Sequence, residues 1–295
     1  MFEHGQIIVL LDPAEESAPA VEKAAQLAQI SEASITLFSS GYDSALSSAH
    51  PHSENARDAY LSRMIDGLEA LADVARNRNV KVATEAVWDK HAGTALLNYL
   101  QDNPADLVVK ATHHQNVLQR TFFSQTDWEL IRHCPVPLLL TKRTAWHDKI
   151  MITAAVDPVR TNDKPDFLDD HIIEYGQKLK KALNGQLQLL HVYDPTPLMI
   201  YLDQPAINSA DVGEEIRQQH KDALDELASR AGIEPDNAKL EMGSPVQVIP
   251  DFLYEYDVDI VIMGAVSRSG IERWLLGHTA EKVLDRITVD ILIAK

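Results

Sequence analysis

The sequence has little cysteine and no long apolar run, and each absence narrows the class of protein. Cys134 is the single cysteine, so the sequence offers no internal disulfide and no cysteine-based metal cluster. We expect Cys134 to be a small buried hydrophobic residue. No stretch of 18 or more apolar residues occurs, so no transmembrane helix is predicted. The first residues lack the basic start and apolar core of a signal peptide, and we therefore expect a cytoplasmic protein.

Basic residues are also scarce. The 295 residues include 44 acidic and only 27 basic side chains, which gives a formal net charge of −17. Nucleic acids and anionic membrane surfaces attract basic proteins, so neither is expected as a partner. Hydrophobic residues make up 45% of the chain and charged residues 24%, as in globular proteins with an ordinary core. The length predicts about two domains.

What the sequence does contain is an alternation of apolar runs and amphipathic stretches. The run QIIVLL at residues 6–11 is typical of a strand covered on both faces in a parallel sheet. Residues 57–76 carry an apolar stripe at helical spacing, and Thr126 with Glu129 predicts a capping box. The first half thus alternates five strands with helices. The predicted strands are residues 6–11, 34–39, 80–87, 106–110 and 137–141, and the predicted helices are residues 16–30, 57–76, 94–102 and 126–132.

The pattern restarts after a polar bridge at residues 143–148. Asp157-Pro158 follows the first strand of the second half, as Asp12-Pro13 follows the first strand of the first half. Strands that alternate with helices predict an α/β fold, in which each half is a doubly wound domain with a five-stranded parallel sheet. The predicted domains are residues 1–143 and 149–295.

The segment that ends each half points to a binding site. Residues 258–295 match the apolar pattern of residues 105–142 without a gap. Each segment is predicted to form a strand, a loop, a helix and a strand. In the second copy Gly264 follows the strand, while Gly277 and Thr279 open the helix. A helix N-terminus at the carboxyl end of a parallel strand is where phosphate groups bind, so the second copy is a candidate phosphate site.

Short motifs run through both halves of the chain: Asp12-Pro13, Asp157-Pro158, His191-Val192-Tyr193, Gly243-Ser244-Pro245, Met263 to Gly270, Leu275 to Thr279, Ser124 to Trp128 and His133 to Pro137. Together they resemble the universal stress protein family, and most closely its tandem, two-domain E-type members. The resemblance implies the adenine nucleotide alpha hydrolase-like fold. It also implies a cofactor in the second half, which is ATP or another adenine nucleotide with Mg²⁺. The ligand-contacting residues that it implies are Asp157, Val192, Met263, Gly264, Val266, Gly277, His278 and Thr279.

The chain departs from the ATP-binding pattern of that family, which is Gly-x2-Gly-x9-Gly-Ser/Thr. In the second half Ser267 replaces the second glycine and His278 replaces the hydroxyl residue. Serine disfavours the positive φ that the loop can require, and each loss would cost on the order of 1–2 kcal/mol. The two together would weaken ATP binding about 30- to 1000-fold. In the first half Ala111, His114 and Ser124 replace all three glycines.

Three functions therefore stay open. The leading prediction is a non-enzymatic stress-response protein that acts through protein partners or a bound small molecule. The first alternative is an ATP-binding protein with weak ATPase activity in the second half. The second is a carrier of a partly apolar, non-nucleotide molecule, with the apolar insertion at residues 198–202 either lining its cavity or packing as ordinary core. The sequence contains no recognisable catalytic triad or Walker motif. The histidines at positions 50, 52, 113 and 114 lack the further ligands that a metal site needs.

The resemblance also implies two structural hypotheses. The sheet order of the family makes the first and fourth strands neighbours, so Lys110 is expected to pair with Asp12 and to fill the ligand pocket of the first half. Single-domain relatives dimerise through their last strands. Residues 136–140 and 289–293 are therefore expected to build that dimer within one molecule, as an intramolecular pseudo-dimer. The whole chain would then be a monomer or a higher homodimer.

Overall fold

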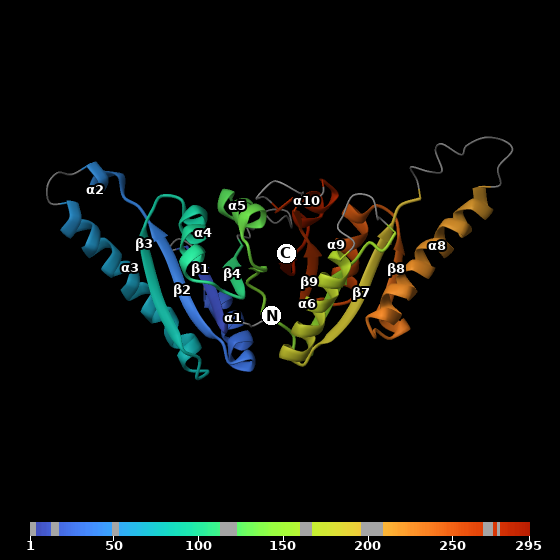
Figure 1. The fold of residues 1–295 in the computed structure, drawn as a ribbon, viewed down its shortest axis with the longest axis horizontal. Coiled ribbons are helices and arrows are strands. Elements are labelled where there is room, and N and C mark those ends of the chain that lie inside the picture. Colours follow the sequence, from blue (N-terminus) through green and yellow to red (C-terminus); the bar gives the residue numbers. More distant parts are fainter. Residues whose placement is uncertain are drawn as a thin grey trace. The chain divides into compact units, whose positions relative to one another are not determined.

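A computed structural model describes residues 4–12, 18–48, 53–112, 123–159, 167–195, 209–267, 274–275 and 278–295. The chain divides into two compact units, which we call unit 1 (mainly residues 1–145) and unit 2 (mainly residues 146–295). Each unit contains a sheet of five parallel strands with helices on both faces (Figure 1). The predicted α/β fold with parallel sheets is confirmed.

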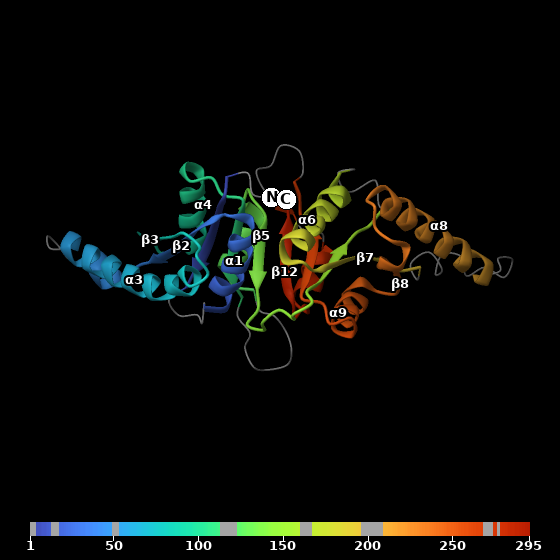
Figure 2. The same ribbon diagram turned by 90° about the horizontal axis from the view of Figure 1, so that it is seen from below.

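Unit 1 consists of β1 (Gln6–Leu11), α1 (Ala18–Ser31), β2 (Ser34–Gly41), α2 (Ser44–Ser48), α3 (Ser53–Arg76), β3 (Val82–Trp88), α4 (Ala92–Asp102), β4 (Leu107–Ala111), α5 (Gln125–His133) and β5 (Leu138–Thr141). Its strand order is β3–β2–β1–β4–β5. α1 and α3 cover one face of the sheet, and α4, with α5 packed against it, covers the other (Figure 2). Ile7, Ile8 and Val9 in β1 are therefore fully buried, as the apolar run predicts.

Unit 2 consists of β6 (Met151–Ala155), α6 (Leu168–Leu183), β7 (Gln186–Tyr193), α8 (Ser209–Arg230), a 3-10 turn (Pro235–Asn237), β8 (Ala238–Met242), α9 (Pro245–Glu255), β9 (Ile260–Gly264), the two-residue strands β10 (Val266–Ser267) and β11 (Trp274–Leu275), α10 (His278–Leu284) and β12 (Asp290–Ala294). Its strand order is β12–β9–β6–β7–β8. α6 and α8 lie on one face, and α9 lies on the other with α10 against it (Figure 2).

One aspartate in each unit fixes the start of its central strand. The carboxylate of Asp106, just before β4, accepts hydrogen bonds from the backbone N–H groups of His4 and Gln6, at 2.9 and 3.0 Å. Asp259, just before β9, accepts from the backbone N–H groups of His147 and Met151 in the same way, at 2.9 and 2.8 Å. Both aspartates are buried. These two residues match in the repeat, and each satisfies backbone donors at and before the start of the central strand of its unit.

The sequence predictions for the ends of the elements need two corrections. The predicted capping box at Thr126 is wrong, because α5 begins earlier. Ser124 is its N-cap, and the side chain of Ser124 accepts from the backbone N–H of Asp127. Helix α3 begins at Ser53, four residues before the predicted start at residue 57, and the short helix α2 is not among the predicted helices. Cys134 is buried, as expected.

Three groups of predictions fall on residues that the structure does not describe. These residues are Pro13, the insertion at residues 198–202, and the histidines at positions 50, 52, 113 and 114. Among the helices that the structure describes, none has both the length and the apolar character needed to cross a membrane.

Candidate functional site

The candidate site lies at the carboxyl edge of the sheet in unit 2. β6 pairs in parallel with β7 on one side and with β9 on the other, so the carboxyl ends of these strands meet at one edge. Asp157 follows β6, Val192 is the penultimate residue of β7, and Gly264 ends β9. Three residues that the resemblance assigns to a ligand are thus at one edge, which is where open α/β sheets bind ligands. Their contact with a ligand stays a prediction.

Asp157 is held by its backbone and keeps its side chain toward solvent. Its N–H donates to Oδ1 of Asp169 at 3.2 Å, and Asp169 is a buried residue in the first turn of α6. The side chain of Asp157 is 41% exposed. This arrangement fixes the turn after β6 and leaves a partly solvated carboxylate at the edge, where it can accept hydrogen bonds.

A buried histidine lies next to Asp157. His191, near the end of β7, is 1% exposed. Its Nδ1 lies 3.1 Å from the carbonyl oxygen of Val156 and 3.9 Å from Oδ1 of Asp157. Its Nε2 lies 2.7 Å from Nδ1 of His220, on α8. Both ring nitrogens of His191 therefore have hydrogen-bond partners within the protein.

The sequence reasoning missed His220. Its ring stacks on His191, with centroids 5.0 Å apart, and on Tyr193, with centroids 4.6 Å apart. A weak signal was present in the sequence. His220 stands between Ile216 and Leu224 at i, i+4 spacing, which places it on the inward stripe of the helix.

Burial sets the charge of this histidine pair. It lowers the pKa of His191, and the negative charge of Asp157 acts in the opposite direction with a smaller effect. Burial also lowers the pKa of His220. An imidazole with an ordinary pKa is already mostly neutral at pH 7, so both rings are neutral at that pH.

The glycine at the end of β9 has a packing role. A Cβ atom built on Gly264 would lie 2.7 Å from Cδ1 of Leu168, the residue that begins α6. The missing side chain therefore lets α6 start directly against the end of β9. The neighbouring Met263 is buried. A phosphate loop is thus not required to explain a glycine at this position.

The remaining predicted contact residues are only partly covered by the structure. Val266 lies in β10, and α10 includes both His278, its first residue, and Thr279. The side chains of these three residues are outside the described part of the chain, as is Gly277 altogether. Ser267 is likewise described only as part of the β10 backbone.

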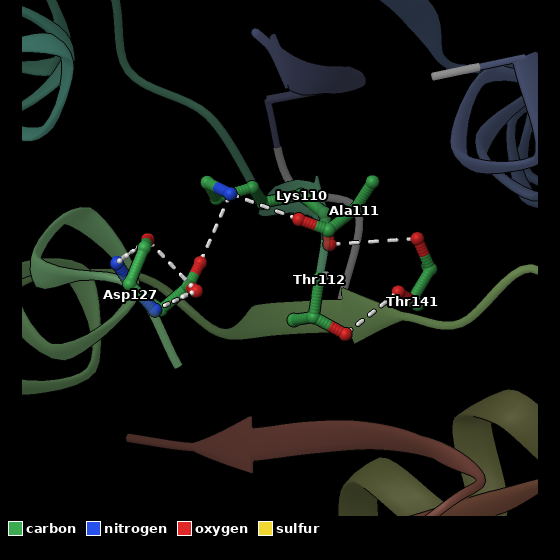
Figure 3. A network of polar contacts seen from close by, with 6 residues as sticks. Lys110, Ala111, Thr112, Asp127 and Thr141 are labelled. Atoms are coloured by element: carbon green, nitrogen blue, oxygen red, sulfur yellow. Dashed lines mark hydrogen bonds and ion pairs between the residues drawn. The ribbon is translucent and has the colours of Figure 1, made fainter. Parts of the chain in front are cut away.

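In unit 1 the carboxyl end of β4, which matches the end of β9 in unit 2, contains a buried ion pair (Figure 3). Nζ of Lys110, in β4, lies 3.0 Å from Oδ1 of Asp127, on α5, and the two side chains are 3% and 0% exposed. Lys110 also donates to the carbonyl oxygen of Ala111. Oδ2 of Asp127 accepts from the backbone N–H of Ser124 at 2.7 Å. The predicted pairing of Lys110 with Asp12 stays a prediction.

The two copies of the repeat differ in charge at the positions of this ion pair. In unit 2 the positions that match Lys110 and Asp127 are Met263 and Ala280. Unit 1 therefore places an internal cation and an internal anion where unit 2 has a methionine and an alanine. Within the residues that the structure describes, no three histidine, cysteine or acidic side chains lie close enough to hold a metal ion.

Comparison with known proteins extends over the whole chain. The sequence profile of the universal stress protein family matches residues 3–142 and 165–295. The universal stress protein E homolog of Haemophilus influenzae is 29% identical over 296 residues, which cover 97% of this chain and 96% of that protein. Universal stress protein E of Escherichia coli is 28% identical over 300 residues, which cover 100% of this chain and 95% of that protein.

Two solved structures share the fold over nearly their whole length. One is a functionally unknown protein of Pseudomonas aeruginosa, with a TM-score of 0.73 and 22% identity, covering 98% of this chain and 92% of that one. The other is a universal stress protein of Archaeoglobus fulgidus, with a TM-score of 0.71 and 16% identity, covering 100% and 99%. The fold, the repeated profile and the full-length relatives agree, and the chain therefore belongs to the universal stress protein family, as a tandem member of the E type.

Proposed function

We propose that this protein acts in the cytoplasmic stress response without catalysing a reaction. In this proposal unit 2 binds a small molecule at the carboxyl edge of β6, β7 and β9, and the occupied protein acts on protein partners. The family and the E-type relatives support the stress-response role. The single cysteine favours the cytoplasm.

The contrast between the two units is the observation that carries the proposal. Unit 1 contains the buried pair of Lys110 and Asp127 where unit 2 has the uncharged Met263 and Ala280. A solvent-accessible carboxylate follows the first strand in both units, as Asp12 and Asp157. A carboxylate at a strand edge can accept hydrogen bonds from hydroxyl or amino groups. Unit 2 is therefore the better candidate for a ligand, and unit 1 the better candidate for a supporting role.

The histidine beside Asp157 supports a binding role over a catalytic one. A general base needs a nitrogen within hydrogen-bond reach of the substrate. Both nitrogens of His191 already have protein partners, Val156 and His220. In this arrangement His191 shapes the edge and does not exchange protons with a substrate.

An ATP-binding protein with weak ATPase activity is the second candidate. The positions of Asp157, Val192 and Gly264 at one edge favour it, because the resemblance assigns all three to an adenine nucleotide. The changes at Ser267 and His278 weigh against it, since they remove groups that would contact phosphate. The third candidate, a carrier of a partly apolar molecule, depends on residues 198–202, which lie outside the described residues.

Calorimetry and native mass spectrometry on the full chain separate these candidates. We would titrate ATP with Mg²⁺ into the wild-type protein, Asp157→Ala and Asp12→Ala, which is the matched control in unit 1. The proposal expects a bound molecule that co-purifies with the wild type and with Asp12→Ala and is lost from Asp157→Ala. It also expects no ATP hydrolysis. Binding of ATP tighter than about 100 μM, or about −5.5 kcal/mol, with turnover that Asp157→Ala abolishes, would establish the second candidate instead.

A further inference from the structure

The first half of α8 is attached to β7 mainly through aromatic rings. The ring of His220 is nearly parallel to the rings of His191 and Tyr193 of β7, with centroids 5.0 and 4.6 Å away, and it hydrogen bonds to His191 at 2.7 Å. Among the side chains described at residues 212–219, none is buried. The second half of α8 has other attachments, since Leu224, Leu227 and Ala228 are buried and Arg230 pairs with Asp170 at 2.8 Å. The histidine contact is thus placed to decide whether the first half stays docked.

The hydrogen bonds fix where the protons of the pair lie. The carbonyl oxygen of Val156 can only accept, so Nδ1 of His191 carries a hydrogen. In the neutral ring Nε2 is then an acceptor, and Nδ1 of His220 donates to it. The first proton added to the pair can bind Nε2 of His220, and Nδ1 of His220 then still donates to His191. A second proton sets two N–H groups against each other across 2.7 Å, and this repulsion opposes the contact.

Charged groups on the surrounding elements modify this response without removing it. Asp157, after β6, and Asp169, on α6, both favour the protonated form of His191. Their effect is smaller than that of burial, which favours the neutral form and lowers the pKa of His191. Burial also lowers the pKa of His220.

α8 and β8 also carry charged side chains near the histidine pair. Glu214 and Arg217, on α8, pair with each other at 2.8 Å and act on Tyr193 with opposite signs. On β8, Leu240 pairs in register with His191. The neighbouring Lys239 and Glu241 therefore point to the opposite face of the sheet, where Lys239 lies over the ring of Tyr256.

We propose that His191 and His220 form a pH-sensitive latch that holds the first half of α8 against β7, and that acidification releases it. Because the docked state disfavours the protonated rings, the open state binds more protons at pH values below about 6.5, the ordinary value for histidine. If His191 stays neutral while docked and behaves ordinarily when released, opening increases about tenfold between pH 7.5 and pH 5.5. The latch lies next to Asp157, so its release changes the candidate site. It does not require that a ligand binds there.

Hydrogen exchange measured by mass spectrometry tests this latch on the full chain. Protection would be compared at pH 7.5 and pH 5.5 after correction for the intrinsic exchange rates. We expect the first half of α8 to lose about tenfold in protection. α3 is the internal reference, because this long helix contains no histidine, and its protection should not change.

A variant and its control separate the latch from a general effect of acid. In His220→Asn the amide does not titrate, and it can offer its NH2 group to neutral His191 or its carbonyl oxygen to the Nε2–H of protonated His191. The docked state then tolerates a protonated His191, so the loss of protection should be smaller than in the wild type. His133→Asn, at an exposed histidine of α5, should keep the full response. Equal protection of α8 at both pH values, an equal loss in α3, or a full response in His220→Asn would overturn the proposal. If His220→Asn does not fold, the comparison of α8 with α3 in the wild type decides alone.

Discussion

Nζ of Lys110 lies 3.0 Å from Oδ1 of Asp127, and both side chains are almost completely buried. A buried ion pair is stabilising only as a pair, because each charge alone would be left in a medium that solvates it poorly. The second copy of the repeat has Met263 and Ala280 at the matching positions. The same two positions of the repeat are thus filled by a charged pair in unit 1 and by uncharged side chains in unit 2.

Exchange of these residues between the copies tests that interpretation. Lys110→Met leaves Asp127 as an isolated buried charge and should lower the free energy of unfolding by about 3–5 kcal/mol. Asp127→Ala should cost a similar amount. The double variant reproduces the residues of unit 2 and should be more stable than either single variant, although it lacks the hydrogen bond that Asp127 accepts from the backbone N–H of Ser124. Urea unfolding measures all three, and additive losses in the double variant would show that the pair is not coupled.

The two aspartates that precede β4 and β9 give a second prediction. Asp259→Ala removes the acceptor of two backbone N–H groups, those of His147 and Met151. Hydrogen bonds to a charged group are worth about 1.5–3 kcal/mol each, so the variant should lose at least that much in urea unfolding. Asp251→Ala, at an exposed position of α9, is the control and should change stability by less than about 0.5 kcal/mol. Equal effects of the two substitutions would contradict the role of Asp259.

Features that depend on local sequence could be predicted, and features that depend on distant side chains could not. The strand predicted at residues 6–11 has the ends that the structure gives, because an apolar run bounded by polar residues is a local signal. The contact between His191 and His220 joins a strand to a helix 29 positions later. The spacing of His220 with Ile216 and Leu224 predicts that it faces inward, but it does not identify His191 as its partner.

The partner of Lys110 illustrates the same limit. The sheet order implied by the family resemblance placed Lys110 correctly in the strand next to β1, and it suggested Asp12 as the partner. The structure adds Asp127, which reaches Lys110 from the first turn of α5. That partner depends on where the helix begins, and the sequence reasoning started α5 at Thr126 with the wrong cap. An error in one helix end was thus enough to hide the ion pair.

Gly264 gives a third prediction, which separates packing from phosphate binding. Gly264→Ala would force a Cβ atom against Leu168, at 2.7 Å from its Cδ1, and overpacking of a buried site costs about 1–3 kcal/mol. Gly67→Ala is the matched control in α3, because its added Cβ meets nothing within 4 Å. It should raise stability by about 0.5–1 kcal/mol, as alanine favours a helix. If Gly264→Ala is as stable as the wild type in urea, Gly264 has no packing role.

The pKa of His191 gives the last prediction, and its sign follows from burial. Because burial lowers the pKa of His191 in the folded protein, the unfolded chain binds more protons as the pH falls below about 6.5. The stabilising effect of the neutral ring is therefore complete above that pH and is lost as the pH falls through the pKa of the folded state. For His191 the loss between pH 7.5 and pH 5.5 is at most about 1.4 kcal/mol. Nitrogen-15 NMR of the imidazole should find His191 as the Nδ1–H tautomer at pH 7, titrating at lower pH than in the urea-unfolded chain. If the folded protein instead held the His191 proton more tightly than the unfolded chain, Asp157 and Asp169 would outweigh burial, and acid would strengthen the contact between β7 and α8.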